Sequence, residues 1–206
     1  MDYFSYLAND INPSATVVMD STVAEMKSRN ADIFPKRIKL ARNLIDFIPR
    51  ARALEILNEG TALIRTISEE EKHQRIAKYL MDVFYGLKTR EDLIRYLMRL
   101  GELDEEQAEL IAHDQVNKAA ERFCVEKWKR QGCKKVKWVH EGATEPRRYH
   151  LRKWNGVSGK RTGRPNGLNG YIFDIDKPPV INQKTKERGY PGQMINCHCR
   201  LVPIWE

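Results

Sequence analysis

The chain has 206 residues, of which 41% are hydrophobic, 9% aromatic and 31% charged, with a mean hydropathy of -0.61 and a formal net charge of +8. This composition excludes a chain too polar to fold, and the length allows one large or two modest globular domains. No apolar run approaches the roughly 18 residues that span a bilayer, and the opening MDYFSYLANDINPS lacks a basic segment followed by an apolar one. We therefore expect no membrane association and no secretion signal. In a reducing cytoplasm, four cysteines indicate thiols or metal ligands rather than a disulfide framework.

Helix signals recur from Pro35 to about Gln131. Apolar residues return every three or four positions in this region, which is the period of a helix with one buried face. Three segments open with the pairing that caps a helix N-terminus: Ser68 with Glu71, Thr89 with Asp92, and Asp104 with Gln107. The expected helices, in chain order, are residues 35–48, 51–60, 68–86, 89–101 and 104–131. One side of the last helix carries mostly small residues, which permit close approach of a neighbouring element: Ala108, Ala112, Val116, Ala119, Ala120 and Phe123.

The sequence changes character at Gly132. Residues 132–206 hold 15 basic and 6 acidic side chains, a net charge of +9, whereas the residues before them sum to -1. Short alternating or apolar runs predict strands in KKVKWVHEG, in GYIFDIDKPP through Ile172 and Ile175, and in CRLVPIW; Gly-rich and Asn-rich stretches between them predict loops. The expected fold class is α+β, with an N-terminal helical region followed by a small loop-rich, β-containing C-terminal domain. We expect the domain boundary between residues 107 and 108, with the long helix 104–131 leading into a basic part, 132–206.

Two closely spaced thiols near the end of the chain, Cys197 and Cys199, raise the question of a metal site. Structural zinc takes four nitrogen or sulfur ligands, commonly from two separated pairs. A set of His150, Cys197 and Cys199, with His140 or Cys133 as the fourth ligand, would suit zinc chemically. The alternative is that both thiols are small packed residues of the last strand and that His150 is a hydrogen-bonded core or turn histidine.

The basic residues of two loops suggest contact with nucleic acid. Flexible Lys and Arg side chains neutralise phosphates without reading bases, so such contact would be non-specific. The alternative is an ordinary solvated surface, and no recognition helix or aromatic-interleaved motif predicts sequence selectivity. The candidate DNA contacts are Lys160, Arg161, Arg164, Lys184, Lys186 and Arg188.

Signals for catalysis are weak. Asp174 and Asp176 lie two positions apart on an expected strand, beside a turn and without other acids nearby. His150 with Asn155 faintly resembles the histidine-metal centre of some nucleases. Because neither signal has its usual companion residues, we expect that the protein is not an enzyme.

Four segments in a fixed order carry a family likeness: AELIAHDQVNKAAERF, GCKKVKWVHEGATEPRRYHLRKWNG, YIFDIDKPP and PGQMINCHCRLVP. Together they resemble the C-terminal domain of the phage Mu F-like minor head proteins. That domain has a helix, a Trp-bearing strand, an Arg-x-x-His or Cys-x-x-Cys segment, a short turn and a terminal Asn-Cys-Arg-Cys-type motif. The likeness covers about Glu109 to Pro203. The matching positions are Trp138, Arg147, His150, Asn155, Gly156, Pro191, Asn196, Cys197 and Cys199.

Some positions depart from the family pattern. His113-Asp114 stands where Arg-Thr or Arg-Asp is more usual, and His198 replaces the Arg between the terminal cysteines. Relatives with Cys-x-x-Cys supply two thiols where this chain has Arg147 and His150. The resemblance therefore implies three of the four metal ligands.

The resemblance implies a structural minor head protein that is associated with the portal inside the capsid and acts in head assembly and in genome packaging or delivery. Residues 1–107 would be a mainly helical docking region and residues 108–206 the Mu F-like domain. The expected partners are the portal protein, a major capsid or scaffold protein, and packaged double-stranded DNA, in a virion protein made in the host cytoplasm. Two alternatives stay open: a zinc-stabilised nucleic-acid-binding domain, and a nuclease or toxin-type domain.

Overall fold

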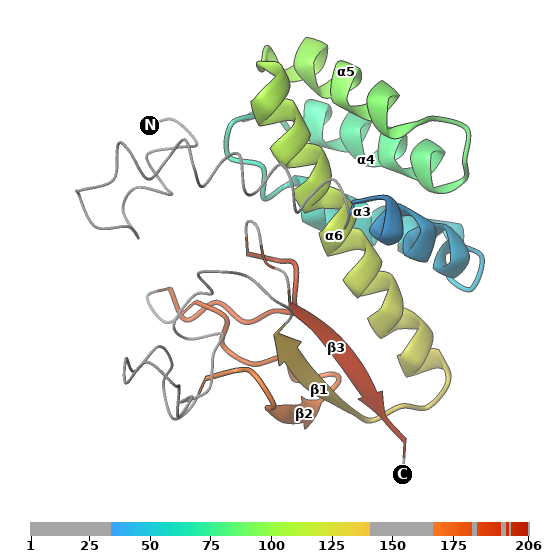
Figure 1. Cartoon of the computed structure of the whole chain (residues 1–206), viewed down its shortest axis with the longest axis vertical. Helices are drawn as coiled ribbons and strands as arrows, with labels where there is room; N and C mark the ends of the chain where they lie inside the picture. The colour runs from blue at the N-terminus through green and yellow to red at the C-terminus, as the bar shows by residue number, and fades with distance from the viewer. Residues whose placement is uncertain (1–33, 141–166, 183–184, 195–196, 198, 206) are drawn as a thin grey trace. The chain divides into compact units, whose positions relative to one another are not determined.

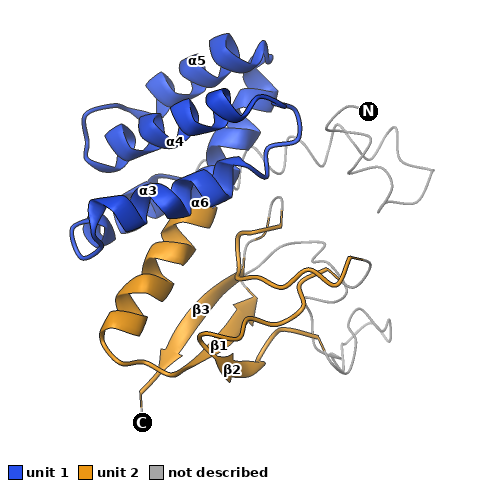
Figure 2. Ribbon diagram, turned by 180° about the vertical axis from the view of Figure 1, so that it is seen from behind, with its two compact units in different colours: residues 1–117 blue, residues 118–206 orange. Residues whose placement is uncertain are grey.

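The computed structural model describes residues 34–140, 167–182, 185–194, 197 and 199–205, and its helices precede a three-stranded antiparallel sheet (Figure 1). The expected α+β fold class is therefore confirmed. The chain divides into two compact units, residues 1–117 (unit 1) and residues 118–206 (unit 2), as Figure 2 shows. This division lies ten residues beyond the expected boundary, within the long helix α6 (Glu105–Arg130). Among the described residues, no helix has the length and apolar character that crossing a bilayer requires.

Unit 1 consists of helices whose apolar stripes face one another. A helix over residues 34–45 is followed by α3 (Arg50–Thr61), α4 (Glu70–Phe84) and α5 (Arg90–Gly101). The predicted helical segments are confirmed, and α4 and α5 each have an apolar stripe that is largely buried. The fully buried members of those stripes are Ile76, Leu80, Val83, Phe84, Leu93 and Leu97.

The helix starts agree with the predicted caps in two of three cases. Thr89 and Asp92 form a capping box, and hydrogen bonds from Thr89 together with Arg95 lower the pKa of Asp92 to about 2. The predicted box of Ser68 with Glu71 is wrong: α4 begins at Glu70, and its cap residue makes no side-chain hydrogen bond. Starting at Glu70 places two glutamates in the first turn, where the helix dipole stabilises negative charge without a hydroxyl cap.

Helix α6 begins and ends as its sequence predicts. The Gln107 amide donates to Asp104 Oδ1 at 2.8 Å, and the small-residue side of the helix is buried throughout. At the other end Gly132 has a φ of 82°, its amide bonds the Lys129 carbonyl at 3.0 Å, and the Cys133 amide bonds the Trp128 carbonyl at 2.9 Å. These two bonds form a Schellman motif, which turns the chain sharply into the sheet.

The sheet of unit 2 has the strand order β2-β1-β3. Strand β1 (Lys135–His140) pairs antiparallel with β2 (Ile172–Asp174) and with β3 (Cys199–Ile204), as all three strand predictions require. One predicted alternation is wrong. Phe173 and Ile175 are buried, whereas Ile172 is 50% exposed, because residues three positions apart cannot share a face of one strand.

A buried carboxylate on α6 accepts a hydrogen bond from the outer edge of β3, the edge that faces away from β1. The backbone N–H and C=O of Trp138 form hydrogen bonds with residues 170–171, on the side of β1 away from β3. Leu201 lies opposite Trp138 on β3, and in such a non-hydrogen-bonded pair its amide points away from β1. That amide donates to Glu121 Oε2 of α6 at 3.1 Å, and Glu121 is only 2% exposed. Because an unpaired edge amide in a buried position is costly, Glu121 fixes the last strand against the helix.

We expect Glu121→Ala to destabilise unit 2 by about 2 kcal/mol, since it leaves the buried Leu201 amide without its acceptor. All four tryptophans lie in unit 2, so urea unfolding followed by tryptophan fluorescence reports on this unit. Glu121→Gln keeps an acceptor oxygen and should lose less. Glu126→Ala removes a carboxylate from a partly exposed position of the same helix and serves as the control. Equal losses for Glu121→Ala and Glu126→Ala would contradict this role.

Candidate functional site

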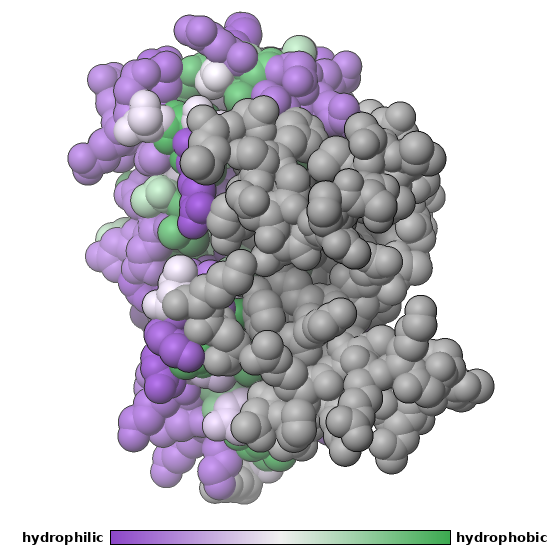
Figure 3. Space-filling view, turned by 90° about the vertical axis from the view of Figure 1, so that its left-hand side faces the viewer, coloured by the Kyte–Doolittle hydropathy of each residue, from purple (hydrophilic) through white to green (hydrophobic). Residues whose placement is uncertain are grey.

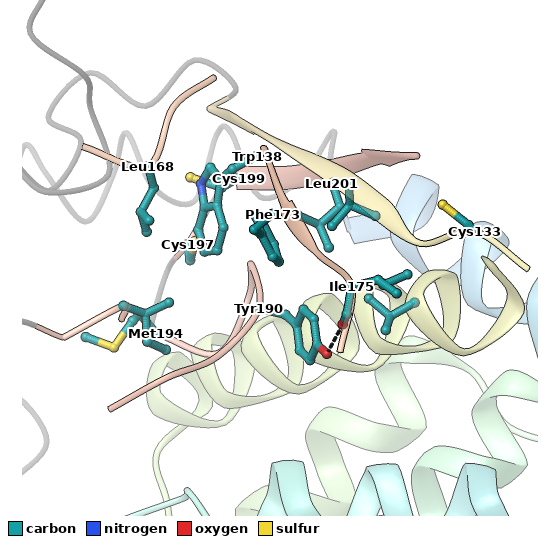
Figure 4. Close-up of a cluster of buried hydrophobic side chains, with 13 residues drawn as sticks. Cys133, Trp138, Leu168, Phe173, Ile175, Tyr190, Met194, Cys197, Cys199 and Leu201 are labelled. Carbon is teal, nitrogen blue, oxygen red and sulfur yellow. Dashed lines mark hydrogen bonds between the residues drawn. The ribbon is translucent and has the colours of Figure 1, made fainter. Parts of the chain in front are cut away.

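The two terminal thiols belong to the hydrophobic core of unit 2. Cys197 is 3% exposed and Cys199 is fully buried, and neither forms a disulfide. Figure 4 shows both beside Trp138, with the Tyr190 hydroxyl donating to the Ile175 carbonyl at 2.6 Å on another side of the cluster. The core consists of Val125, Cys133, Val136, Trp138, Leu168, Phe173, Ile175, Ile181, Tyr190, Met194, Cys197, Cys199 and Leu201.

His140 is the predicted ligand that the sheet brings to these thiols. The β1–β3 register places His140 opposite Cys199, and the His140 Nδ1 lies 3.3 Å from the Cys199 Sγ although the two residues are 59 positions apart. The His140 amide also donates to Asn169 Oδ1 at 3.1 Å, which fixes this end of the strand. One imidazole and two thiols therefore gather at one end of β1.

Cys133 lies at the other end of β1. Its Sγ is 3.2 Å from the Lys135 carbonyl and 3.7 Å from that of Ile204, whereas Cys199 pairs five residues further along the strand. At about 3.4 Å per residue this separation is roughly 17 Å. Figure 4 likewise shows Cys133 well apart from Cys197 and Cys199. The proposed fourth ligand Cys133 is thus excluded, because a zinc ion binds sulfur at about 2.3 Å.

The surroundings of Cys199 favour its protonated, neutral form. The pKa of Cys199 is raised above its ordinary value, mainly by a hydrogen bond with Cys197 and next by burial. A hydrogen bond with Trp138 lowers this pKa, but by less. A buried, neutral thiol is a poor nucleophile and must lose its proton before it binds zinc. These properties of Cys199 fit a packed core residue.

Metal binding remains a prediction. Within the described ranges, no group of three or more His, Cys, Asp or Glu side chains has an arrangement that could hold a metal ion. His150 lies outside the described residues, so the ligand set His150, Cys197 and Cys199 is not tested. The residues that are described fit the alternative hypothesis, in which the thiols are packed core residues.

The family-motif positions that are described contribute to the same unit. Trp138 is fully buried in β1, Pro191 is buried ahead of the last strand, and both thiols lie in the core. The others lie outside the described residues, namely Arg147, His150, Asn155, Gly156 and Asn196.

Two predicted DNA contacts are described, and both are exposed. Lys186 has a φ of 59°, a left-handed conformation that turns the chain, and Arg188 Nη1 donates to the Pro178 carbonyl at 3.0 Å. The remaining four predicted contacts lie outside the described residues: Lys160, Arg161, Arg164 and Lys184. Exposure is what phosphate contact requires, and the structure does not otherwise test this prediction.

The two carboxylates that raised the question of catalysis have structural roles. Asp174 Oδ1 accepts from the Asp176 amide at 2.9 Å, which closes a turn at the end of β2. Asp176 Oδ1 lies 2.6 Å from Lys129 Nζ, which ties that turn to the end of α6. In the described part of the chain, neither carboxylate belongs to a group of three or more His, Cys, Asp or Glu side chains that could hold a metal ion.

Glu121 and Tyr190 are important residues that the sequence analysis missed. Glu121 bonds β3, Tyr190 bonds Ile175, and the Arg122 guanidinium lies 5.4 Å from the centre of the Tyr190 ring. A signal for Glu121 was available, because a second buried stripe that includes Cys124 and Val125 follows it along α6. That stripe indicates that the end of the helix is covered on a second side.

Comparison with models of known protein families, with curated proteins and with solved structures finds no match for this chain.

The described geometry predicts that Cys197→Ala and Cys199→Ala each cost about 1 kcal/mol in unfolding free energy, as for an average core substitution. Chelators should then leave the urea unfolding of unit 2 unchanged. Cys133→Ala, a buried thiol at the other end of β1, is the matched control. One equivalent of zinc by elemental analysis, with unfolding of unit 2 on chelation, would contradict packing and establish a metal site at Cys197 and Cys199.

Proposed function

We propose that the chain is a structural protein of a phage head, of the Mu F-like minor head class. In this proposal unit 1 binds the portal region inside the capsid, and unit 2 contacts packaged double-stranded DNA without sequence selectivity. The protein acts in head assembly and in genome packaging or delivery, and it has no catalytic role. Major capsid or scaffold protein is a further candidate partner.

The observation that supports this proposal most directly is the meeting of separated motif residues in one core. Trp138 comes from the first strand of unit 2, whereas Cys197 and Cys199 come from the end of the chain, and all three belong to one buried cluster. Motif positions that define a single domain are expected to converge in this way, whereas a chance likeness of separate segments has no reason to do so.

The charge distribution supports contact between unit 2 and DNA. Residues 132–206 carry a net charge of +9 at neutral pH, and the two predicted contacts that are described are exposed. Lys and Arg side chains of this kind neutralise backbone phosphates and release counterions, which gives affinity without sequence selectivity.

Unit 1 offers an exposed apolar patch to a protein partner. Phe47, Tyr85 and Leu87, here named the Phe47–Leu87 patch, are 57%, 38% and 70% exposed. Their turns lie side by side, because Arg42 Nε donates to the Val83 carbonyl at 3.0 Å and the Arg50 guanidinium lies 5.8 Å from the Tyr85 ring centre. In the view of Figure 3, the described surface is mostly hydrophilic, with smaller hydrophobic areas. An apolar patch beside arginines fits a partner surface with apolar and acidic side chains.

One observation favours a second candidate function. The contact between His140 and Cys199 supplies two of the ligand types that zinc prefers, as in a zinc-stabilised nucleic-acid-binding domain. The nuclease or toxin-type alternative receives no such support, because the described carboxylates close turns and the thiols are buried and neutral.

We expect the chain to co-purify with filled heads, and deletion of its gene to reduce infectious particles while shell protein still accumulates. Phe47→Ser with Leu87→Ser should lower its incorporation at least tenfold, because both side chains are more than half exposed and the substitutions remove most of the apolar surface of the patch. Thermal unfolding of unit 1 in the double variant checks that the unit is still folded. Quantitative mass analysis of purified particles measures the incorporation.

Leu63→Ser is the matched control, because Leu63 is 42% exposed but follows the far end of α3. Absence of the wild-type chain from purified heads would refute the proposed function. Normal incorporation of the double variant would mean that the chain is a head protein but binds its partner through a surface other than the Phe47–Leu87 patch.

A further inference from the structure

A dense run of cations connects α6 to β1. Residues 127–137 contain six basic side chains and no acidic one, and we name this region, from the last turn of α6 to the middle of β1, the α6–β1 corner. It lies outside both of the loops in which DNA contact was predicted. Its basic residues are Lys127, Lys129, Arg130, Lys134, Lys135 and Lys137.

The backbone of the α6–β1 corner is held in place by hydrogen bonds. The Schellman motif at Gly132 fixes the turn, the Ile175 amide bonds the Lys134 carbonyl at 2.9 Å, and Lys135 and Lys137 are paired on both sides within the sheet. Binding at such a surface orders side chains only, so its entropic cost is smaller than for a flexible loop.

The fold itself accounts for some of these cations. Lys129 Nζ forms an ion pair with Asp176 at 2.6 Å, and Lys135 is opposite Asp174 in the sheet register. Basic residues in the last turn of α6 also complement the negative end of the helix dipole.

Lys134 and Lys137 are left without either explanation, and Arg130 has the helix dipole alone. Arg130, Lys134 and Lys137 are exposed, and no acidic side chain in the described part of the chain forms an ion pair with any of them. Lys134 and Lys137 lie beyond the end of α6, so the helix dipole does not account for them.

The α6–β1 corner continues into one of the predicted DNA contacts. Lys134 bonds Ile175, the exposed Lys177 follows two residues later, and Arg188 donates to the adjacent Pro178 carbonyl. Cations from three separate segments of unit 2 therefore lie along one connected stretch of backbone. Such a band matches a linear array of phosphates better than a single anion.

We propose that the α6–β1 corner binds the phosphate backbone of double-stranded DNA through Arg130, Lys134 and Lys137. This inference deepens the proposed function and rests on it only for the choice of DNA as the partner. A duplex is favoured over a single strand because stacking of successive bases needs exposed aromatic side chains. Trp138 is fully buried and Trp128 is partly buried against the core, whereas Trp205, which follows the Lys135 partner Ile204, is 55% exposed. These tryptophans therefore offer one exposed ring rather than the row of rings that stacks successive bases.

Salt-dependent binding of the full chain to labelled duplexes of two unrelated sequences tests the proposal. We expect the variant Arg130→Gln, Lys134→Gln, Lys137→Gln to lower the slope of log affinity against log salt by about 2 to 3, since each phosphate contact contributes roughly 0.9. The matched control is Lys36→Gln, Lys39→Gln, Lys78→Gln, which removes three exposed lysines of unit 1 and changes the net charge equally. The control should leave the slope unchanged.

Equal slopes for the corner variant and its control would overturn the proposal. It would also be overturned if Lys160→Gln, Arg161→Gln, Arg164→Gln abolished the whole salt dependence, because the loop would then account for all of the binding. A corner variant that loses binding to single strands or to anionic phospholipid vesicles, but not to duplex, would assign the surface to those partners instead.

Protection of lysines in the wild-type chain gives a second test that needs no variant. Duplex DNA should slow acetylation of Lys134 and Lys137 at least fivefold and leave Lys36 and Lys78 unaffected, whereas equal rates with and without DNA would contradict the proposal. These outcomes separate the two ideas. A chain absent from phage heads that still shows the protection refutes the proposed function alone, and a head protein without the protection refutes the α6–β1 corner alone.

Discussion

The pairing of β1 with β3 is the constraint on which the rest of unit 2 depends. It joins residues 59 positions apart, and a loop of that length costs conformational entropy that local preferences cannot repay. The compensation comes from burial: Trp138 packs into the core beside both terminal thiols, and Glu121 satisfies the outer edge of the last strand. This register places His140 beside Cys199 and leaves Cys133 at the other end of β1. It therefore allows His140, and excludes Cys133, as a fellow ligand of a metal ion bound to Cys199.

The core of unit 2 and the described part of its surface differ in electric charge. Inside, hydrogen bonding and burial raise the pKa of Cys199 and so favour its neutral form. Outside, Arg130, Lys134 and Lys137 of the α6–β1 corner form no ion pair with an acidic side chain of the described residues. A packed core that carries exposed cations on its surface fits the proposed binding to a polyanion.

Much of the fold was predictable from local sequence, and the errors have physical causes. The helices, the Thr89 cap and the end of α6 at Gly132 are set by short-range periodicity and turn chemistry. Whether Ile172 or Phe173 is buried depends on the register of the sheet. The contact between His140 and Cys199 depends on pairing between distant strands. Neither follows from the spacing of residues in the sequence alone. The role of Glu121 was missed because a charged residue within a helix is ordinarily solvated, and only a strand edge beside it gives the carboxylate a reason to be buried.

Cross-linking within intact, filled heads tests the central claim most directly, because it asks in one experiment what each unit touches. Mass analysis after brief formaldehyde treatment should find DNA adducts on lysines of residues 118–206 and protein cross-links to portal from residues 1–117. DNA adducts confined to residues 1–117, or particles that contain the chain without any DNA adduct, would contradict the account.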